Sequence, residues 1–171
     1  MAYECFELQQ ESGVAHLRMN RPERRNAMTL AFWRELPEIV RRLDARALVI
    51  SSTGPHFTAG MDLSVFAQST LATGTVDERR AFRAKLEELQ QSFHAIAEAP
   101  FPVIAAVQGG CIGGGVDLVT ACFLRYATRD AFFVIQEINL GMMADVGTFN
   151  RMPKQIPEAV VRELGYTGDR L

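Results

Sequence analysis

The sequence has little cysteine, and its cysteines do not form a recognisable metal or disulfide pattern. The 171 residues include 3 cysteines, an odd number, and no two of them have Cys-x-x-Cys spacing. The 3 histidines are scattered along the chain without the spacing of metal ligands. These features argue against a disulfide scaffold and against a zinc site. We therefore expect reduced thiols at Cys5, Cys111 and Cys122, and no bound metal.

Long apolar runs and a strong net charge are also missing. No run of about 18 apolar residues is present, and residues 1–5 show neither a secretory leader nor an Arg/Ser-rich transit pattern. The formal net charge is −2 at pH 7, so the surface as a whole does not attract a phosphate-rich polymer. We expect no membrane or nucleic acid partner and a cytoplasmic location.

What is present is the composition of an ordinary globular domain, which we assign to residues 1–171. Hydrophobic residues make up 48% of the chain and charged residues 22%. Short apolar runs at 47–50 and 101–107 predict buried strands, and the amphipathic pattern at 77–98 predicts a long helix between them. Strands that alternate with helices favour an α/β fold with parallel pairing.

The glycine-rich stretch 109–118 follows one of these strands. It reads Gly-Gly-Cys-Ile-Gly-Gly-Gly-Val-Asp-Leu and leads into a helical pattern. Glycines leave backbone N–H groups uncovered at the start of a helix, which is a favourable place for a negatively charged oxygen. The stretch lacks the order of a dinucleotide fingerprint or a P-loop. The plain alternative is a tight strand-to-helix connection in which the glycines only allow close packing.

Three acidic residues are candidates for proton transfer. Asp117 lies just after the glycines, Glu137 follows an apolar run, and Asp145 lies in a segment rich in small and apolar residues. Apolar surroundings raise the pKa of a carboxyl group toward neutral pH, where it can exchange protons. The alternative is a first-turn helix acid for Asp117 and solvated loop acids for the other two.

Together with 57–63 (Phe-Thr-Ala-Gly-Met-Asp-Leu) and 136–141 (Gln-Glu-Ile-Asn-Leu-Gly), the glycine stretch resembles the crotonase superfamily of enoyl-CoA hydratases and isomerases. The resemblance extends over essentially the whole chain. It implies the ClpP/crotonase fold, a spiral of β-β-α repeats. Within the superfamily the chain looks most like the dienoyl-CoA isomerases of fatty acid β-oxidation, which convert 3,5-dienoyl-CoA to 2,4-dienoyl-CoA.

The resemblance also implies roles for individual residues. The N–H groups of Met61 and Gly114 would form an oxyanion hole for the thioester enolate. Asp145 would remove a proton near the thioester, Glu137 would deliver one at the far end of the acyl group, and Asp117 would support the pair. No cofactor is implied, since coenzyme A enters as part of the substrate. The substrate-binding residues by similarity are Arg24, Arg25, Ala27, Ala59, Gly60, Asp62, Leu63 and Gly115.

The chain departs from the family pattern in length. Family members continue through helices that build a trimer and cover the acyl pocket, whereas this sequence ends at Leu171. A homo-oligomer, trimeric or hexameric, is therefore expected only with that C-terminal helical region. Two other functions stay open: an enoyl-CoA hydratase that uses Glu137 and Asp117, and a catalytically silent acyl-CoA-binding or assembly subunit.

Overall fold

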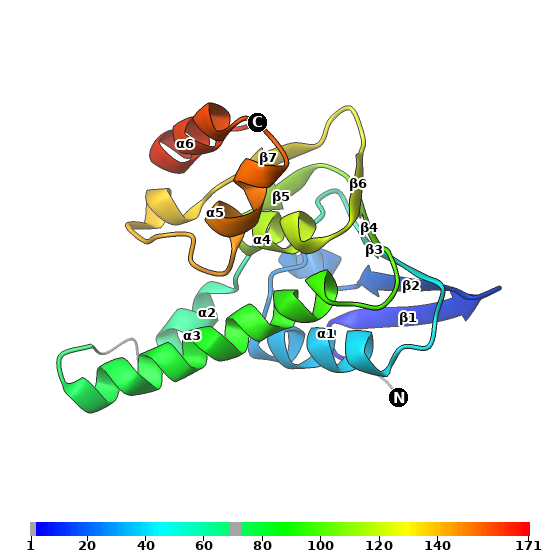
Figure 1. Cartoon of the computed structure of the whole chain (residues 1–171), viewed down its shortest axis with the longest axis horizontal. Coiled ribbons are helices and arrows are strands. Elements are labelled where there is room, and N and C mark those ends of the chain that lie inside the picture. Colours follow the sequence, from blue (N-terminus) through cyan, green and yellow to red (C-terminus); the bar gives the residue numbers. More distant parts are fainter. Residues whose placement is uncertain (1–2, 69–72) are drawn as a thin grey trace.

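The computed structural model, which describes residues 3–68 and 73–171, is built around a five-stranded sheet (Figure 1). Its order is β1-β2-β3-β4-β6. The tight turn at Ser12 and Gly13, both with positive φ, makes β1 and β2 antiparallel, and every other neighbouring pair is parallel. The strands are β1 (Phe6–Glu11), β2 (Val14–Met19), β3 (Ala47–Ser52), β4 (Val103–Val107) and β6 (Leu124–Ala127).

A second, two-stranded sheet shows how the chain spirals. Strand β5 (Gly110–Ile112) pairs in parallel with β7 (Phe132–Val134), and Thr58 forms a parallel bridge to Cys111 of β5. Three successive passes of the chain thus place one strand in the large sheet and one segment beside it in the small sheet. This is the spiral of β-β-α repeats that the resemblance implied.

The helices surround these sheets, with α1 and α3 side by side below the large sheet in Figure 1. The hydroxyl of Ser92 on α3 donates to the carbonyl of Trp33 on α1 at 2.9 Å, and the Trp33 and Phe93 rings are in contact. A capping box between Thr75 and Glu78 begins α3. The helices are α1 (Leu30–Arg42), α2 (Leu63–Gln68), α3 (Val76–Ala97), α4 (Gly114–Ala121), α5 (Thr148–Arg151) and α6 (Glu158–Thr167), with 3₁₀ turns η1 (Pro22–Arg24), η2 (Glu137–Leu140) and η3 (Met152–Lys154).

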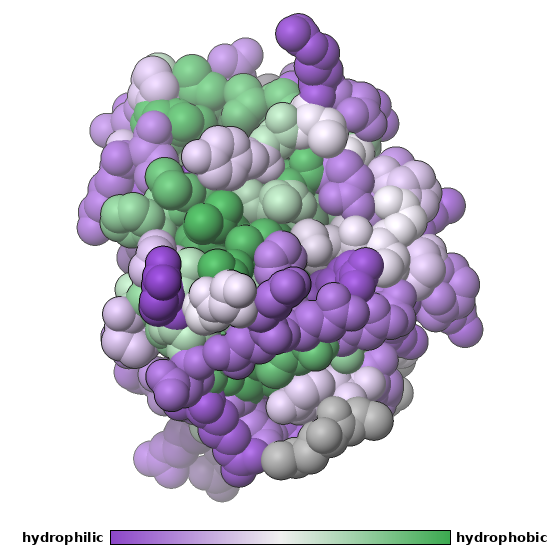
Figure 2. Space-filling view, turned by 90° about the vertical axis from the view of Figure 1, so that its right-hand side faces the viewer, coloured by the Kyte–Doolittle hydropathy of each residue, from purple (hydrophilic) through white to green (hydrophobic). Residues whose placement is uncertain are grey.

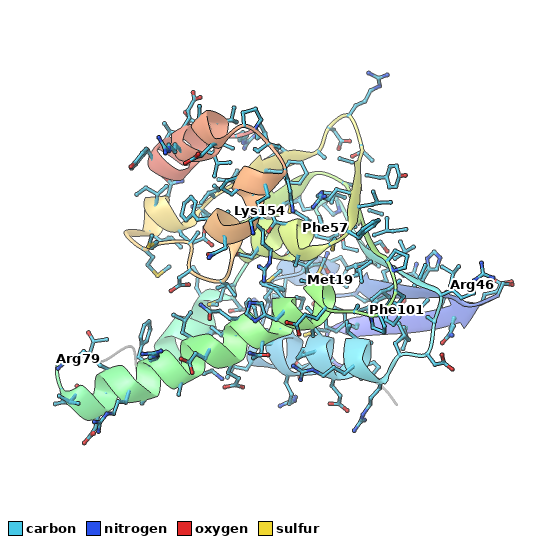
Figure 3. All side chains as sticks on the ribbon, in the orientation of Figure 1. Met19, Arg46, Phe57, Arg79, Phe101 and Lys154 are labelled. Atoms are coloured by element: carbon cyan, nitrogen blue, oxygen red, sulfur yellow. The ribbon has the colours of Figure 1, made fainter. Side chains whose placement is uncertain are left out.

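Apolar side chains fill the space between the sheets and helices. Figure 3 shows Phe57 and Met19 in the interior of the fold, whereas Arg46 and Arg79 lie at its outer edges. Phe57 and Met19 are buried, and they belong to the main core cluster. This core fixes the loops that follow β3 and β5, which form part of the site described below.

Gly115, at the start of α4, has no room for a side chain. A Cβ on this residue would lie 2.5 Å from Cγ2 of Thr58 and 3.1 Å from Sγ of Cys111, and both side chains are completely buried. We expect Gly115→Ala to lower the free energy of unfolding by about 1–3 kcal/mol, because the core must shift to accept a methyl group. Urea denaturation measures this loss. Gly74→Ala is the control, because its Cβ would meet only Glu78 Oε2 at 3.5 Å; equal losses for both variants would contradict the expectation.

Candidate active site

A cavity of about 1060 Å³ lies between α3 and the loops that follow β3, β5 and β7. Its α3 wall is largely apolar and includes Phe82, Leu86 and Leu89. The polar groups on its other walls come from the loop at 59–63, the start of α4 and the segment 136–146. An apolar cavity with a few converging polar groups is the usual form of a small-molecule site.

Two backbone amides converge on this cavity from separate loops. A Cβ on Gly114 would lie 3.9 Å from the nitrogen of Met61, and a Cβ on Gly60 would lie 3.4 Å from the nitrogen of Gly114. The positive φ angles of Gly60 (+82°) and Gly113 (+53°) turn the chain just before each amide. Within residues 3–68 and 73–171, neither the Met61 nor the Gly114 N–H donates to a protein acceptor. Both donors are therefore free to bind a ligand oxygen.

Asp117 is a completely buried acid on the wall of the same cavity. Its Oδ1 accepts two hydrogen bonds from Thr148, one from the N–H at 2.7 Å and one from the hydroxyl at 2.8 Å. Burial raises the pKa of Asp117 to about 6, although the bonds from Thr148 and the charge of Arg151 act in the opposite direction. The residue can thus hold a proton in mildly acidic solution.

Glu137 begins the 3₁₀ turn η2 and lies beside the glycine loop. Its Oε1 would be 3.2 Å from a Cβ on Gly113, the residue just before the free amide of Gly114. Burial, together with the nearby charge of Asp117, raises the pKa of Glu137 to about 7. Glu137 is therefore the acid whose protonation changes close to neutral pH.

Asp145 lies at the exposed rim of the cavity, in the loop that leads to α5. The backbone of this loop is held from two sides. Gln90 on α3 donates to the carbonyl of Asp145 at 2.7 Å, and Arg151 on α5 donates to the carbonyl of Val146 at 3.2 Å. Partial burial raises the pKa of Asp145. Three acids with raised pKa values thus share one cavity with two free amides.

Comparison with known proteins identifies the family. Residues 9–171 match the family model described as enoyl-CoA hydratase/isomerase. The chain belongs to the enoyl-CoA hydratase/isomerase family. The crotonase resemblance and fold expected from the three sequence motifs are therefore confirmed.

Individual relatives in this family carry two kinds of name. The chain is 48% identical over 166 residues to the Homo sapiens protein named Delta(3,5)-Delta(2,4)-dienoyl-CoA isomerase, mitochondrial, in a match that covers 92% of this chain and 51% of that protein. It is 41% identical over 168 residues to the peroxisomal protein of the same name from Arabidopsis thaliana, covering 94% and 60%. A crystal structure of a putative enoyl-CoA hydratase from Thermobifida fusca YX, in complex with acetoacetyl-CoA, superimposes with a TM-score of 0.87 at 29% identity, covering 98% of this chain and 68% of that chain. The chain spans about half the length of the curated human relative.

Most of the residues assigned by family resemblance lie on the cavity wall. They are Arg24, Ala27, Ala59, Gly60, Met61, Asp62, Leu63, Gly114, Asp117, Glu137 and Asp145. Arg25 and Gly115 are not on that wall. Arg25 is exposed in a left-handed conformation, and Gly115 is buried against Thr58 and Cys111, as the close-packing alternative required. For these two positions the expected substrate contact stays a prediction.

Asp62 lies on the cavity wall and also stabilises the start of α2. Its Oδ1 accepts from the N–H of Ser64 at 2.9 Å, at the start of α2, and the hydrogen bonds from Ser64 lower its pKa. A carboxylate held ionised in this way caps α2. It repels rather than attracts the phosphates of a nucleotide-like ligand.

Several residues of the site were not singled out by the sequence. Trp33 lines the cavity, and its Nε1 has no hydrogen-bond partner within the described part of the chain. Thr148 and Gln90 were missed because their bonds to the acids join positions 31 and 55 residues apart. No local pattern signals such contacts.

The described residues contain no group of three or more His, Cys, Asp or Glu side chains placed to hold a metal ion. In the same residues, no helix is both long and apolar enough to cross a membrane.

The raised pKa of Glu137 predicts how stability depends on pH. In the unfolded chain this group ionises near 4.5, so between about pH 4.5 and 7 the folded state binds more protons. The free energy of unfolding should therefore fall as the pH rises through this window, by about 2 kcal/mol between pH 5 and 8 from this residue. Urea denaturation at both pH values measures the change. Glu137→Gln should reduce the fall and the exposed control Glu163→Gln should not; an unchanged fall in Glu137→Gln would contradict the assignment.

Proposed function

We propose that this chain carries the active site of a dienoyl-CoA isomerase, which converts a 3,5-dienoyl-CoA to the 2,4-dienoyl-CoA during fatty acid β-oxidation. The observation that carries the proposal is the meeting of two free amides and three acids with raised pKa values in one largely apolar cavity. The names of the curated relatives, at 41–48% identity, support the same reaction.

The two amides assist the first step of the proposed reaction, the removal of a proton from the substrate. Removal of a proton from C2 of the acyl group moves negative charge onto the thioester oxygen. The N–H groups of Met61 and Gly114 bind that oxygen as the charge develops, and one such donor contributes roughly 3–4 kcal/mol to the transition state. The scheme uses proton transfer alone and needs no cofactor besides the coenzyme A of the substrate.

The positions of the acids suggest which carbon each one serves. Glu137 lies against Gly113, next to the oxyanion amide of Gly114, so we assign it to the C2 proton. Asp145 lies at the rim, tied to α3 through Gln90, so we assign it to C6, where a new C–H bond forms as the double bonds shift to C2=C3 and C4=C5. This order is the reverse of the one expected by family resemblance. Asp117 supports Glu137 through its neighbouring charge.

Arg24 is the candidate contact for the coenzyme A phosphates. It is exposed, it lies on the cavity wall, and it belongs to η1, which immediately precedes the loop that places Ala27 on the same wall. A guanidinium group binds phosphate oxygens well in such a position.

The exposed apolar surface bears on the proposed homo-oligomer. Figure 2 shows apolar residues gathered in the upper part of one face, above a mainly polar lower part. The chain leaves Phe123 71% exposed and Leu124 of β6 41% exposed. We propose that self-association covers the exposed side chains of Phe123 and Leu124, and the mass of the protein in solution tests this.

The cytoplasmic location stays a prediction, since the relatives' names contain the words mitochondrial and peroxisomal.

Incubation with two thioesters tests the proposed reaction. With 3,5-dienoyl-CoA we expect the growth of the ultraviolet absorbance of a conjugated 2,4-dienoyl product. Loss of the absorbance of 2-enoyl-CoA without activity on the dienoyl substrate would instead support a hydratase. Binding of coenzyme A without turnover of either thioester would support a silent acyl-CoA-binding subunit and overturn the proposal.

A further inference from the structure

Asp117 has two carboxyl oxygens in very different surroundings. Oδ1 accepts both the N–H and the hydroxyl of Thr148, at 2.7 and 2.8 Å. Oδ2 is buried and has no hydrogen-bond partner in the described part of the chain. A carboxyl group rarely leaves one oxygen unpaired in the interior, because an unpaired buried polar atom is costly. The asymmetry therefore needs an explanation from the chemistry of the site.

The donors on Oδ1 restrict where a proton can be carried. An oxygen that already accepts two hydrogen bonds from N–H and O–H groups has no free lone pair for a proton without losing one of those bonds. A proton on Asp117 therefore belongs on Oδ2. Since Asp117 lines the cavity, Oδ2 is the oxygen left to interact with the substrate or with a neighbouring acid.

We propose that Thr148 is a positioning residue that holds Oδ1 of Asp117 and thereby confines the proton exchange of this acid to Oδ2. The inference rests on the function proposed above and adds to it a residue that does not itself line the cavity. Thr148 begins α5, directly after the loop that carries Asp145, so one short segment sets the geometry of two of the three acids.

The other charged and titratable groups that interact with Asp117 come from η2, α5, β5 and the loop before α5. Glu137 of η2 and Asp145 of the following loop are acids that interact with it, Arg151 of α5 is the cation, and Cys111 of β5 is a buried thiol. Within the described residues, none of these side chains forms a hydrogen bond with the Asp117 carboxyl group. The hydrogen bonds that position this carboxyl group thus come from Thr148.

The test is to titrate the Asp117 carboxyl group by carbon-13 NMR, with its resonance assigned by its loss in Asp117→Asn. Thr148→Val keeps the side-chain shape and the backbone donor but removes the hydroxyl. We expect its titration midpoint to rise by about one to two pH units, because a hydrogen bond to the charged form is lost. Thr148→Ser should titrate within a few tenths of a unit of the parent chain.

Thr120→Val is the matched control. Thr120 is also a buried threonine bonded to Asp117, but its hydroxyl donates to the backbone carbonyl at 2.9 Å and not to the carboxyl group. It should leave the midpoint unchanged. In the isomerase assay, Thr148→Val should lower kcat about tenfold with little change in KM and shift the pH profile in the same direction as the NMR midpoint.

The possible results separate the two proposals. An unshifted midpoint in Thr148→Val, or an equal shift in Thr120→Val, overturns the role of Thr148. If the parent chain turns over no acyl thioester, the proposed function fails, while the titration, which needs no substrate, still decides whether Thr148 holds the carboxyl group.

Discussion

Replacement of Glu137 by glutamine is expected to lower kcat for a 3,5-dienoyl-CoA by about 10²- to 10⁴-fold, the usual contribution of a positioned acid or base. Glutamine keeps the shape of the side chain, but an amide cannot exchange the C2 proton. In Glu137, Oε1 lies close to Gly113, and the pKa of about 7 suits proton exchange near neutral pH. KM should change little, since the apolar wall and Arg24 remain.

The Glu137 prediction is checked by the initial rate of absorbance increase at saturating substrate. Asp145→Asn should be impaired in the same assay, because the far end of the acyl group then lacks its proton donor. The exposed Glu163→Gln is the control and should keep the parent rate. If Glu137→Gln retains at least half of the parent kcat, proton transfer by this residue is ruled out.

The sequence predicted those parts of the fold that depend on neighbouring residues. The helical pattern expected after the glycine-rich stretch is α4, and the amphipathic pattern at 77–98 differs from α3 by one residue at each end. Both helices could be predicted because apolar spacing and helix start signals depend only on residues a few positions apart. The short helices α2 and α5 were not expected, because four to six residues carry no periodic pattern. The small and polar residues of 68–76 predict a mobile stretch, and part of it, 69–72, lies outside the described residues.

The candidate site was predicted only in part, for the same physical reason. The motifs showed which loops carry free amides and acids, since glycines and carboxylates are visible in the sequence. What each carboxylate contacts depends on residues far along the chain, such as Thr148 for Asp117. The order of Glu137 and Asp145 along the substrate likewise depends on how η2 packs against the glycine loop, which spacing does not encode.

The exposed position of Phe123 shows a similar limit. By resemblance it stands where relatives commonly carry an aspartate, and from the sequence alone the expected effect is a change in core or surface packing near the site. In the structure Phe123 follows α4 at the surface and is 71% exposed. This exposure favours a role in self-association instead of catalysis.

Gly114→Pro should reduce kcat by about 10²- to 10³-fold, because it removes one of the two proposed oxyanion donors. Proline lacks an N–H group, and the first residue of a helix is the place where a proline is best tolerated, so α4 can still form. Circular dichroism and the urea midpoint check that the variant is folded before its rate is measured.

Gly114→Ala is the matched control because it adds a side chain and keeps the N–H. A Cβ at this position would meet Met28 Sδ at 3.1 Å and Trp33 Cη2 at 3.7 Å, and the thioether can move aside. The nitrogen of Met61 lies 3.9 Å from that Cβ. In the proline variant, the N–H of Met61 would remain as the single donor. If both folded variants lose the same rate, the loss comes from crowding of the cavity, and the Gly114 amide does not stabilise the enolate. If only Gly114→Pro is slow, the charge that develops on the thioester oxygen depends on this N–H.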